Sequence, residues 1–264
     1  MRGGIPASLV ALAAAFVFSS PVQAQSWGNF WHAPPKPTPC VLDECLNGGA
    51  KGVPQPPGAQ AEPAPSTQPA GAGAPGDFDF YLLTLSWSPG FCDLGGDRKA
   101  PDQCSAGAGL GFVVHGLWPQ YQHGYPQDCD GGGRPVSRAA LDLTRGVFPD
   151  EGLARYEWRK HGACTGLSPE AFFATVRRAR DAIAIPEAFK APREAQSVSP
   201  RDLARAFIAA NPGLRFDAIA ATCRSGELED VRFCLSKDLR SFVSCAEVAR
   251  RTCRAPTISI PPVR

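Results

Sequence analysis

Net charge is almost absent from this sequence. Its 264 residues carry 27 Lys and Arg against 25 Asp and Glu, which gives a formal net charge of +2. A protein that holds nucleic acid over a broad surface is usually far more basic, because it has to neutralise many phosphates. The composition therefore argues against a broad polyanion-binding surface and leaves a local cleft that engages a polyanion transiently.

The sequence also lacks any Cys-x-x-Cys pair, although it contains ten cysteines. Cys40 and Cys45 are five positions apart and Cys92 and Cys104 are twelve apart. Neither pair resembles the cysteine knuckles that hold zinc. We therefore expect no metal ion and no other cofactor.

An apolar run long enough to span a bilayer comfortably is missing as well. The run from Leu9 to Phe18 is short, follows Arg2, and is followed by small residues in Val22–Ala24 that suit cleavage before Gln25. This layout predicts a secretory signal peptide over residues 1–24, with an uncleaved membrane anchor as the alternative. All ten cysteines lie beyond it. We expect a periplasmic or secreted protein, without a membrane anchor, whose even number of cysteines forms disulfides.

Residues 25–76 have few of the side chains that build a core. Pro, Ala, Gly and Gln dominate this stretch, so burial cannot offset the entropy of ordering the backbone, and we interpret it as an extended linker. Cys40 and Cys45 could close a small loop within it. Trp27, Phe30 and Trp31 lie before that loop, either as a docking segment or as a poorly ordered end.

Regular elements are predicted after the linker. Phe78–Trp87 predicts a buried strand, and Gly111–His115 predicts a shorter strand that ends at a turn. Ser168-Pro169 and Ser199-Pro200 each place a capping serine before a proline, which is typical of a helix start. Apolar residues at spacings of three and four support both helices: Phe172, Val176, Ala179 and Ile183 in one, and Leu203, Ala206, Phe207 and Ala210 in the other.

The last predicted strand is the alternating stretch from Val231 to Ser236. Strands and helices do not alternate strictly along the chain, which favours an α+β fold over a doubly wound sheet. About 180 residues follow the linker, enough for one domain with its own core. We place this domain at residues 77–256, with a C-terminal tail at 257–264.

Two segments concentrate residue types that do chemistry. In the first, Phe112–Gln120, a predicted strand leads into His115, Gly116 and Trp118. In the second, Tyr156–Cys164, a short helix ended by Gly162 carries Glu157 and His161 four positions apart, with Lys160 adjoining His161. Side chains at the end of a strand are often presented to a cleft.

These residue types suit cleavage of RNA through its own 2′-hydroxyl. One histidine can accept the hydroxyl proton while the other, charged, gives a proton to the leaving oxygen. Lys160 could stabilise negative charge in the transition state, and Glu157 could orient His161 and raise its pKa. Trp118 could stack on a base. The alternative for any single histidine is a structural or surface role.

Both segments resemble the active-site segments of the ribonuclease T2 family. His115-Gly-Leu-Trp-Pro119 is similar to the first and Glu157-Trp-Arg-Lys-His-Gly-Ala-Cys164 to the second, in the same order. Tyr81–Trp87 and His123–Cys129 also resemble family segments, and the similarity extends from about Asp77 to Cys253. The resemblance implies an α+β domain with a central antiparallel sheet and flanking helices, stapled by disulfides.

The resemblance also implies roles for individual residues. His161 would be the base and His115 the acid of the first step, supported by Glu157 and Lys160. Trp118, Tyr125, Gln120 and Tyr156 would contact substrate. The implied disulfides are Cys92–Cys104, Cys129–Cys164, Cys223–Cys253 and Cys234–Cys245, which leaves Cys40–Cys45 for the linker. The expected product chemistry is transphosphorylation to 2′,3′-cyclic phosphate ends on single-stranded RNA, and not on DNA.

Two positions depart from the pattern of many family members. Tyr156 stands where many carry a third histidine before the glutamate, and a tyrosine donates a hydrogen bond but brings no charge. Gln120 stands where several relatives carry an acidic or amide residue that contacts a base. Base preference therefore does not follow from the resemblance.

The sequence leaves three alternative functions open. The chain could be a catalytically weak T2-like protein that binds RNA without turnover. It could be a disulfide-rich envelope interaction protein whose proline-rich arm binds a partner. It could also be a zinc hydrolase using His115, His123 and Glu157, although their spacing does not support a zinc site. RNA cleavage in excess chelator separates these functions.

The linker should be dispensable for catalysis. A chain that starts at Asp77 retains both active-site segments and the eight cysteines paired by resemblance, so we expect it to match the full chain in turnover and thermal midpoint under oxidising conditions. A truncated chain that folds normally yet loses most of its activity would show that the arm completes the site.

Overall fold

The computed structural model describes Met1 and residues 74–129 and 133–264. The elements belong to one compact unit, Glu62–Arg264. The predicted signal peptide, most of the linker and the Cys40–Cys45 loop lie outside the described residues. The strands are β1 Phe80–Trp87, β2 Phe112–Gln120, β3 Gln196–Val198, β4 Ile219–Arg224, β5 Glu227–Ser236 and β6 Ile258–Ile260.

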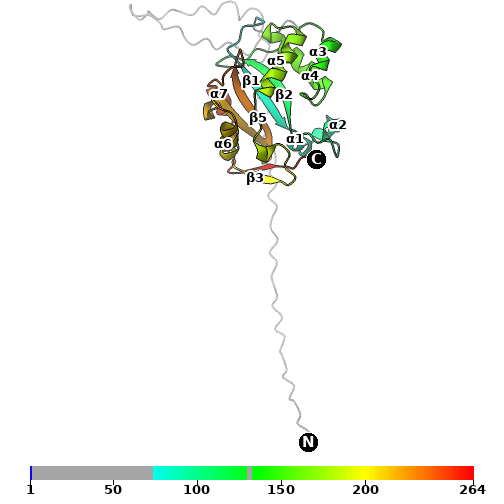
Figure 1. The fold of residues 1–264 in the computed structure, drawn as a ribbon, viewed down its shortest axis with the longest axis vertical. Coiled ribbons are helices and arrows are strands. Elements are labelled where there is room, and N and C mark those ends of the chain that lie inside the picture. Colours follow the sequence, from blue (N-terminus) through cyan, green and yellow to red (C-terminus); the bar gives the residue numbers. More distant parts are fainter. Residues whose placement is uncertain (2–73, 130–132) are drawn as a thin grey trace, which may run out of the picture. The chain divides into compact units, whose positions relative to one another are not determined.

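The helices are α1 Ser88–Asp93, α2 Pro101–Cys104, α3 Arg138–Asp142, α4 Glu151–Lys160, α5 Pro169–Asp181, α6 Pro200–Ala210 and α7 Ala246–Ala249. Short 3₁₀ helices follow several of them: η1 Gly96–Arg98, η3 Gly162–Thr165, η4 Glu187–Phe189 and η5 Phe216–Ala218. Figure 1 shows α3, α4 and α5 at one end of the sheet, with α6 and α7 along the side of β5.

The strands form one six-stranded sheet in the order β2-β1-β5-β6-β3, with β4 paired to the other side of β5. The pairs β1–β2, β1–β5, β4–β5 and β3–β6 are antiparallel, and β5 meets β6 in parallel at Glu227 and Ser259. An α+β fold with a central antiparallel sheet is therefore confirmed.

The two longest capped helices begin where the serine-proline pairs predict. The Ser168 side chain accepts a hydrogen bond from the Ala171 amide, and Ser199 does the same for Asp202, so each satisfies an amide left free in the first turn. Helix α4 begins at Glu151, earlier than predicted, because the Asp150 carboxylate caps the Leu153 amide.

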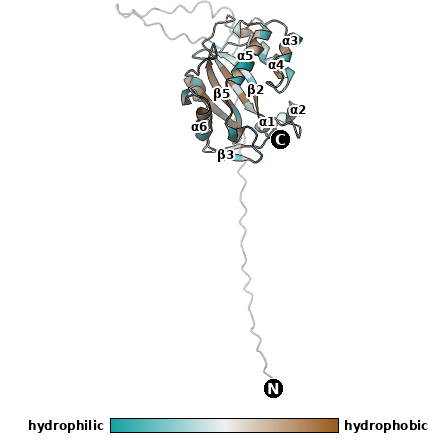
Figure 2. Ribbon diagram, in the orientation of Figure 1, coloured by the Kyte–Doolittle hydropathy of each residue, from teal (hydrophilic) through white to brown (hydrophobic). Residues whose placement is uncertain are grey.

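Strand β1 is buried on both faces, and its two faces pack different clusters. Leu83, Leu85 and Trp87 face the main core beneath α5 and α6, whereas Phe80 and Leu82 face a smaller cluster that includes α7. The strands at the centre of the sheet are accordingly coloured as hydrophobic in Figure 2. Because both faces are covered, a polar side chain on the central strands has to find partners within the protein.

Four disulfides staple the domain, with the pairing that the family resemblance implies. They join Cys92 to Cys104, Cys129 to Cys164, Cys223 to Cys253 and Cys234 to Cys245. The last two tie the strand pair β4–β5 to the segment around α7. The second ties the loop before residue 130 to η3.

The second predicted strand is longer than expected. We expected it to end at a turn after His115, but β2 continues to Gln120. Pro119 has no amide hydrogen and is tolerated because β2 lies at the edge of the sheet, where one side of the strand needs no partner.

The expected domain boundaries also differ from the structure at both ends. Residues 257–264, expected to be a tail, contain β6, in which Ile258 and Ile260 are buried. At the other end, the Gly76 amide donates to the Cys164 carbonyl at 2.8 Å, and Lys237 donates to the Gly76 carbonyl at 3.1 Å. A chain starting at Ala74 would keep these bonds and is the matched control for truncation at Asp77.

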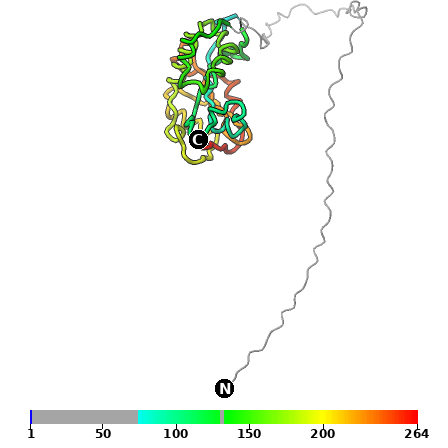
Figure 3. The backbone as a smooth tube through the Cα atoms, turned by 90° about the vertical axis from the view of Figure 1, so that its right-hand side faces the viewer, coloured from blue at the N-terminus to red at the C-terminus, as the bar shows by residue number. Residues whose placement is uncertain are grey.

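The C-terminal residues lie against the first helices. Gly109 donates to the Arg264 carbonyl, and the Arg264 guanidinium contacts Asp93 and the Cys104 carbonyl. Figure 3 shows this end of the chain beside the segment that follows β1. In the described part of the chain, no helix has both the length and the apolar character that crossing a membrane requires.

Two phenylalanines test the location of the core. Phe207 is fully buried, with its ring 5.3–5.7 Å from those of Phe233 and Phe112, whereas Phe216 is 48% exposed. We expect Phe207→Ala to lower the free energy of unfolding by about 3–5 kcal/mol, because it leaves a cavity. Phe216→Ala should cost less than about 1 kcal/mol. Chemical denaturation measures both; similar losses in the two variants would contradict this assignment of the core.

Candidate active site

Polar side chains gather on one face of the three neighbouring strands β2, β1 and β5. The register places Ser86 of β1 opposite Asp230 of β5, and Thr84 opposite Arg232. On the other side of β1, Leu82 lies opposite Trp118 of β2. These side chains share the face of the sheet that carries the smaller apolar cluster.

A β-bulge turns His115 onto this same face. Thr84 pairs with Gly116 and Leu85 pairs with Val114, so His115 is an extra residue between them. Strict alternation with Leu117, which is buried in the main core, would direct the imidazole into that core. The extra residue resets the alternation and aims the imidazole at Ser86 and Asp230 instead.

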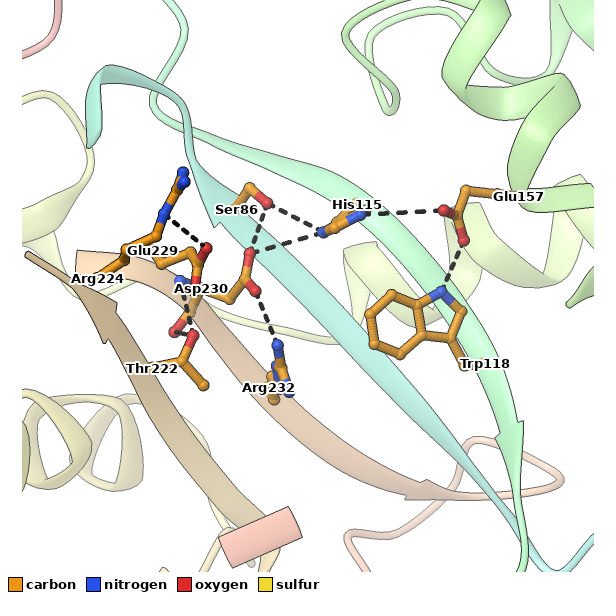
Figure 4. A network of polar contacts seen from close by, with 9 residues as sticks. All are labelled: Ser86, His115, Trp118, Glu157, Thr222, Arg224, Glu229, Asp230 and Arg232. Carbon is orange, nitrogen blue, oxygen red and sulfur yellow. Dashed lines mark hydrogen bonds and ion pairs between the residues drawn. The ribbon is translucent and has the colours of Figure 1, made fainter. Parts of the chain in front are cut away.

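Helix α4 brings Glu157 to the other side of His115. The carboxylate is almost fully buried, with Oε1 3.9 Å from Nε2 of His115, and Oε2 accepts a hydrogen bond from Nε1 of Trp118 at 2.6 Å. Gly116 makes this approach possible, because a Cβ there would overlap the Trp118 indole nitrogen and the Glu157 carboxylate. Figure 4 shows His115 between Glu157 on one side and Asp230 with Ser86 on the other.

His161 caps the end of α4 and also lies beside Trp118. The Trp118 ring centre is 5.4 Å from that of His115 and 5.3 Å from that of His161. His161 itself is 8% exposed. Its Nδ1 is buried, with no hydrogen-bond partner among the residues that the structure describes. Lys160 points to the neighbouring loop, where Nζ donates to the Asp128 carboxylate at 3.1 Å.

The expected pairing of Glu157 with His161 is wrong in its geometry. Four positions separate the two residues, but the helix ends at Lys160, and His161 has φ −128°, outside the helical range. The side chain therefore leaves the face that carries Glu157, whose contacts are His115 and Trp118 instead.

The two histidines have opposite electrostatic surroundings. Burial first, and then the positive charge of Lys160, lower the pKa of His161 to about 4. Burial also lowers the pKa of His115, but the contact with Asp230 and the negative charges of Asp230 and Glu157 outweigh it, so the pKa of His115 is raised. A neutral and a charged imidazole beside one indole can accept and donate a proton in the same event.

The two carboxylates that face His115 differ from each other. Burial raises the pKa of Glu157 to about 7, although His115, the Trp118 hydrogen bond and Lys160 lower it. Burial also raises the pKa of Asp230, but His115 and then the Ser86 hydrogen bond and the Arg232 charge outweigh this, so its pKa is lowered. Asp230 is thus the carboxylate held ionised, and Glu157 is the one that can share a proton near neutral pH.

Two cavities open beside these side chains. The first, of about 200 Å³, is lined by His161, Trp118, Gln120, Tyr125 and Arg232 together with α7 residues such as Glu247 and Val248. The second, of about 430 Å³, is lined by His115, Ser86 and Tyr156 together with Phe91, Lys99 and Asp150. The predicted substrate residues Trp118, Gln120 and Tyr125 therefore lie together, whereas Tyr156 lies beside the other histidine.

No metal site is visible in residues 74–129 and 133–264, where no three His, Cys, Asp or Glu side chains are grouped to hold an ion. His123 lies exposed in its loop and does not join His115 and Glu157.

Sequence reasoning missed Ser86, Asp230 and Arg232. Asp230 and Arg232 alternate with the apolar residues of β5, a pattern typical of a strand with one solvated face. That face is covered, since Asp230 is 3% exposed. Asp230 and Arg232 carry opposite charges two positions apart, and this pairing of charges in a predicted strand was the sequence signal that could have identified them.

Comparison with known proteins finds similarity over the part of the chain that contains these residues. A family model described as the Ribonuclease T2 family matches residues 78–245. A ribonuclease of Aeromonas hydrophila is 34% identical over 210 residues, which cover 73% of this chain and 89% of that protein. Ribonuclease I of Escherichia coli strain K12 is 32% identical over 194 residues, covering 56% of this chain and 71% of that protein.

Solved structures resemble the domain as well. An RNase-related protein from Calystegia sepium superposes with a TM-score of 0.53 at 20% identity, covering 71% of this chain and 98% of that one. A mutant of RNase MC1 in complex with 5′-UMP gives a TM-score of 0.52 at 20% identity, covering 69% of this chain and 97% of that one. At 20% sequence identity, these two superpositions support the fold of the domain alone.

The charge states of the two histidines can be measured directly. We expect the ring protons of His161 to titrate near pH 4 and those of His115 above the ordinary value of 6.5, because burial keeps His161 neutral and two carboxylates hold the charge on His115. An NMR titration between about pH 2.5 and about pH 8.5, assigned with His→Gln variants, gives both values. Titration of His161 at a higher pH than His115 would contradict this electrostatic picture.

Proposed function

Because the chain belongs to the ribonuclease T2 family and is therefore an endoribonuclease, we propose that it cleaves single-stranded RNA by transphosphorylation, without a metal ion. The observation that carries this proposal is the pair of histidines beside Trp118, one surrounded so as to stay neutral and the other so as to stay charged. This asymmetry suits a concerted proton transfer.

His161 acts as the base of the first step and His115 as the acid. Neutral His161 takes the proton of the 2′-hydroxyl, and the 2′-oxygen forms a bond to phosphorus. The bond from phosphorus to the 5′-oxygen breaks, and charged His115 gives its proton to that oxygen. The products are a 2′,3′-cyclic phosphate end and a free 5′-hydroxyl. The lowered pKa of His161 and the raised pKa of His115 support this order of roles.

Glu157 and Lys160 support the transition state. Glu157 faces Nε2 of His115 and holds Trp118, so it stabilises the charged imidazole and keeps the indole in place. The ammonium of Lys160, bound to Asp128 on the adjoining loop, supplies positive charge near His161 for the phosphorane-like transition state.

Bases and phosphate bind in the two cavities beside the histidines. Trp118 and Tyr125 provide aromatic faces in the first cavity, and Gln120 contributes a side-chain amide to its lining. Tyr156, which is 48% exposed, donates a hydrogen bond to phosphate beside His115. RNA is the substrate and DNA is not, because DNA lacks the 2′-hydroxyl that acts as nucleophile.

The protein works outside the cytoplasm, in the periplasm or as a secreted enzyme. The signal-like N-terminal segment and the disulfides of the domain both support export, since disulfides persist in oxidising compartments. The competing candidate is a catalytically weak envelope protein that binds RNA in the same cavities. Turnover on a defined RNA decides between the two.

The products of a defined RNA test the mechanism. We expect 2′,3′-cyclic phosphate and 5′-hydroxyl ends as first products, no cleavage of the matching DNA, and an unchanged rate in excess chelator, because the substrate supplies the nucleophile and histidines move the protons. Mass spectrometry of the fragments reports the ends. Comparable DNA hydrolysis, 5′-phosphate ends or inhibition by the chelator would contradict the mechanism.

Single substitutions test the assigned roles. His115→Ala and His161→Ala should each lower turnover by roughly 10²–10⁴-fold with the fold intact, the usual size of general acid–base catalysis. Glu157→Gln and Lys160→Ala should cost less, roughly ten- to a thousandfold, as electrostatic partners do.

Matched controls are available for both kinds of residue. His123→Ala removes an exposed histidine, and Lys190→Ala removes an exposed lysine that is paired with Glu187; both should leave turnover unchanged. A His115 or His161 variant that keeps more than about a tenth of wild-type turnover could not be removing an acid–base group.

A further inference from the structure

The imidazole of His115 is held at both nitrogens, and the mechanism above uses one of these contacts. We propose that Asp230 is a positioning residue: directly and through Ser86, it holds Nδ1 of His115 so that Nε2 presents the acidic proton to the leaving oxygen. The inference rests on the proposed function and adds a residue that does not touch substrate.

Hydrogen-bond geometry decides which nitrogen of His115 faces the substrate. The Ser86 hydroxyl donates to Oδ1 of Asp230 at 2.6 Å, and its oxygen lies 3.4 Å from Nδ1 of His115. Because the only hydroxyl proton goes to Asp230, the Ser86 oxygen presents a lone pair to Nδ1. Asp230 Oδ1 lies 3.7 Å from the same nitrogen. Both neighbours accept, so Nδ1 carries a proton in either charge state.

Asp230 is itself fixed from several sides. Arg232 donates to its second carboxylate oxygen at 3.1 Å, and its backbone amide donates to the Thr222 hydroxyl at 3.2 Å. The residue is 3% exposed, on a central strand. A buried carboxylate with this many partners has one orientation, which it can impose on the imidazole that it faces.

The contacts close into a ring around the site. Arg232 lies over the Trp118 indole, 5.9 Å from its centre, and Trp118 donates to Glu157, which faces Nε2 of His115. Figure 4 shows the chain of contacts from Asp230 through His115 to Glu157 and Trp118. Side chains from β5, β1 and α4 together therefore hold the imidazole.

Taken together, the charges that face His115 favour its protonated form. Asp230 on β5 and Glu157 on α4 favour the imidazolium, and Arg232 on β5 opposes it. The remaining titratable groups around it either line its cavity or interact through charge: Lys99, Asp150, Tyr156 and His161. Removing the charge of Asp230 while Arg232 stays would therefore favour loss of the proton from His115.

Two substrates separate positioning of the acid from a structural role. An RNA dinucleotide needs a proton on its leaving 5′-oxygen, whereas a nucleoside 3′-(4-nitrophenyl) phosphate releases a phenolate that needs none. We expect Asp230→Asn to slow the dinucleotide roughly ten- to a thousandfold and the aryl ester less than about threefold, because only general-acid assistance is lost. His161→Ala should slow both.

A pH profile gives an independent readout. The basic limb of kcat/KM on the dinucleotide should move to lower pH in Asp230→Asn, because the charge that raises the pKa of His115 is gone. Asp142→Asn removes an exposed carboxylate that also pairs with arginines, and should change neither the substrate ratio nor the profile. Ser86→Ala should show the same split between substrates, weaker, and replaces Asp230→Asn if that variant does not fold.

Three results would overturn the proposal: equal slowing of both substrates, an unchanged rate on the dinucleotide, or a basic limb that stays in place. Failure of the proposed function looks different, because the wild-type protein itself would then leave the dinucleotide intact.

Discussion

One imidazole faced by two buried carboxylates is the arrangement on which the rest of the site depends. Glu157 and Asp230 lie on opposite sides of His115, and both are nearly inaccessible to solvent. Burying two carboxylates is costly unless each has partners. Trp118 and His115 partner Glu157, while Ser86, Arg232 and His115 partner Asp230. The sheet face, the bulge and helix α4 are arranged so that these partners meet.

The second histidine, His161, is buried without a described carboxylate against its ring. His161 lies at the end of α4 with Lys160 beside it, and no described carboxylate contacts its ring. Burial without a counter-charge keeps an imidazole neutral, whereas burial between two carboxylates keeps one charged. The Trp118 ring lies at similar distances from the two imidazoles. A single indole thus lies beside both the accepting and the donating histidine.

The disulfides join the walls of this site to the sheet. Cys234 lies on β5 next to the residues that hold His115, and its bond to Cys245 anchors the start of α7, which lines the cavity beside Trp118. Cys129–Cys164 ties the loop that carries Asp128, the partner of Lys160, to the residues that follow His161. Both sides of the site are therefore fixed by covalent bonds that an oxidising environment maintains.

The sequence by itself predicted the elements whose signals are local. Capping serines, the buried first strand and the grouping of His115, Trp118, Glu157 and His161 into one site follow from short segments, whereas the cysteine pairing followed from the family resemblance. A capping residue acts on an amide three positions away, and a motif keeps its residue types together, so neither needs the rest of the chain.

Tertiary structure decided which way these side chains point and what they contact. The bulge that aims His115 exists only where β2 pairs with β1, and Asp230, which meets the imidazole there, lies more than a hundred residues further along the chain. In a single sequence, Asp230 and Arg232 have the alternation of a solvated strand face, and Glu157 and His161 have the spacing of one helical face. Ser86 and His115 from distant parts of the chain pack against Asp230 on the first face, and the end of α4 separates the second pair. Strand register and bulges depend on long-range packing, which local patterns do not encode.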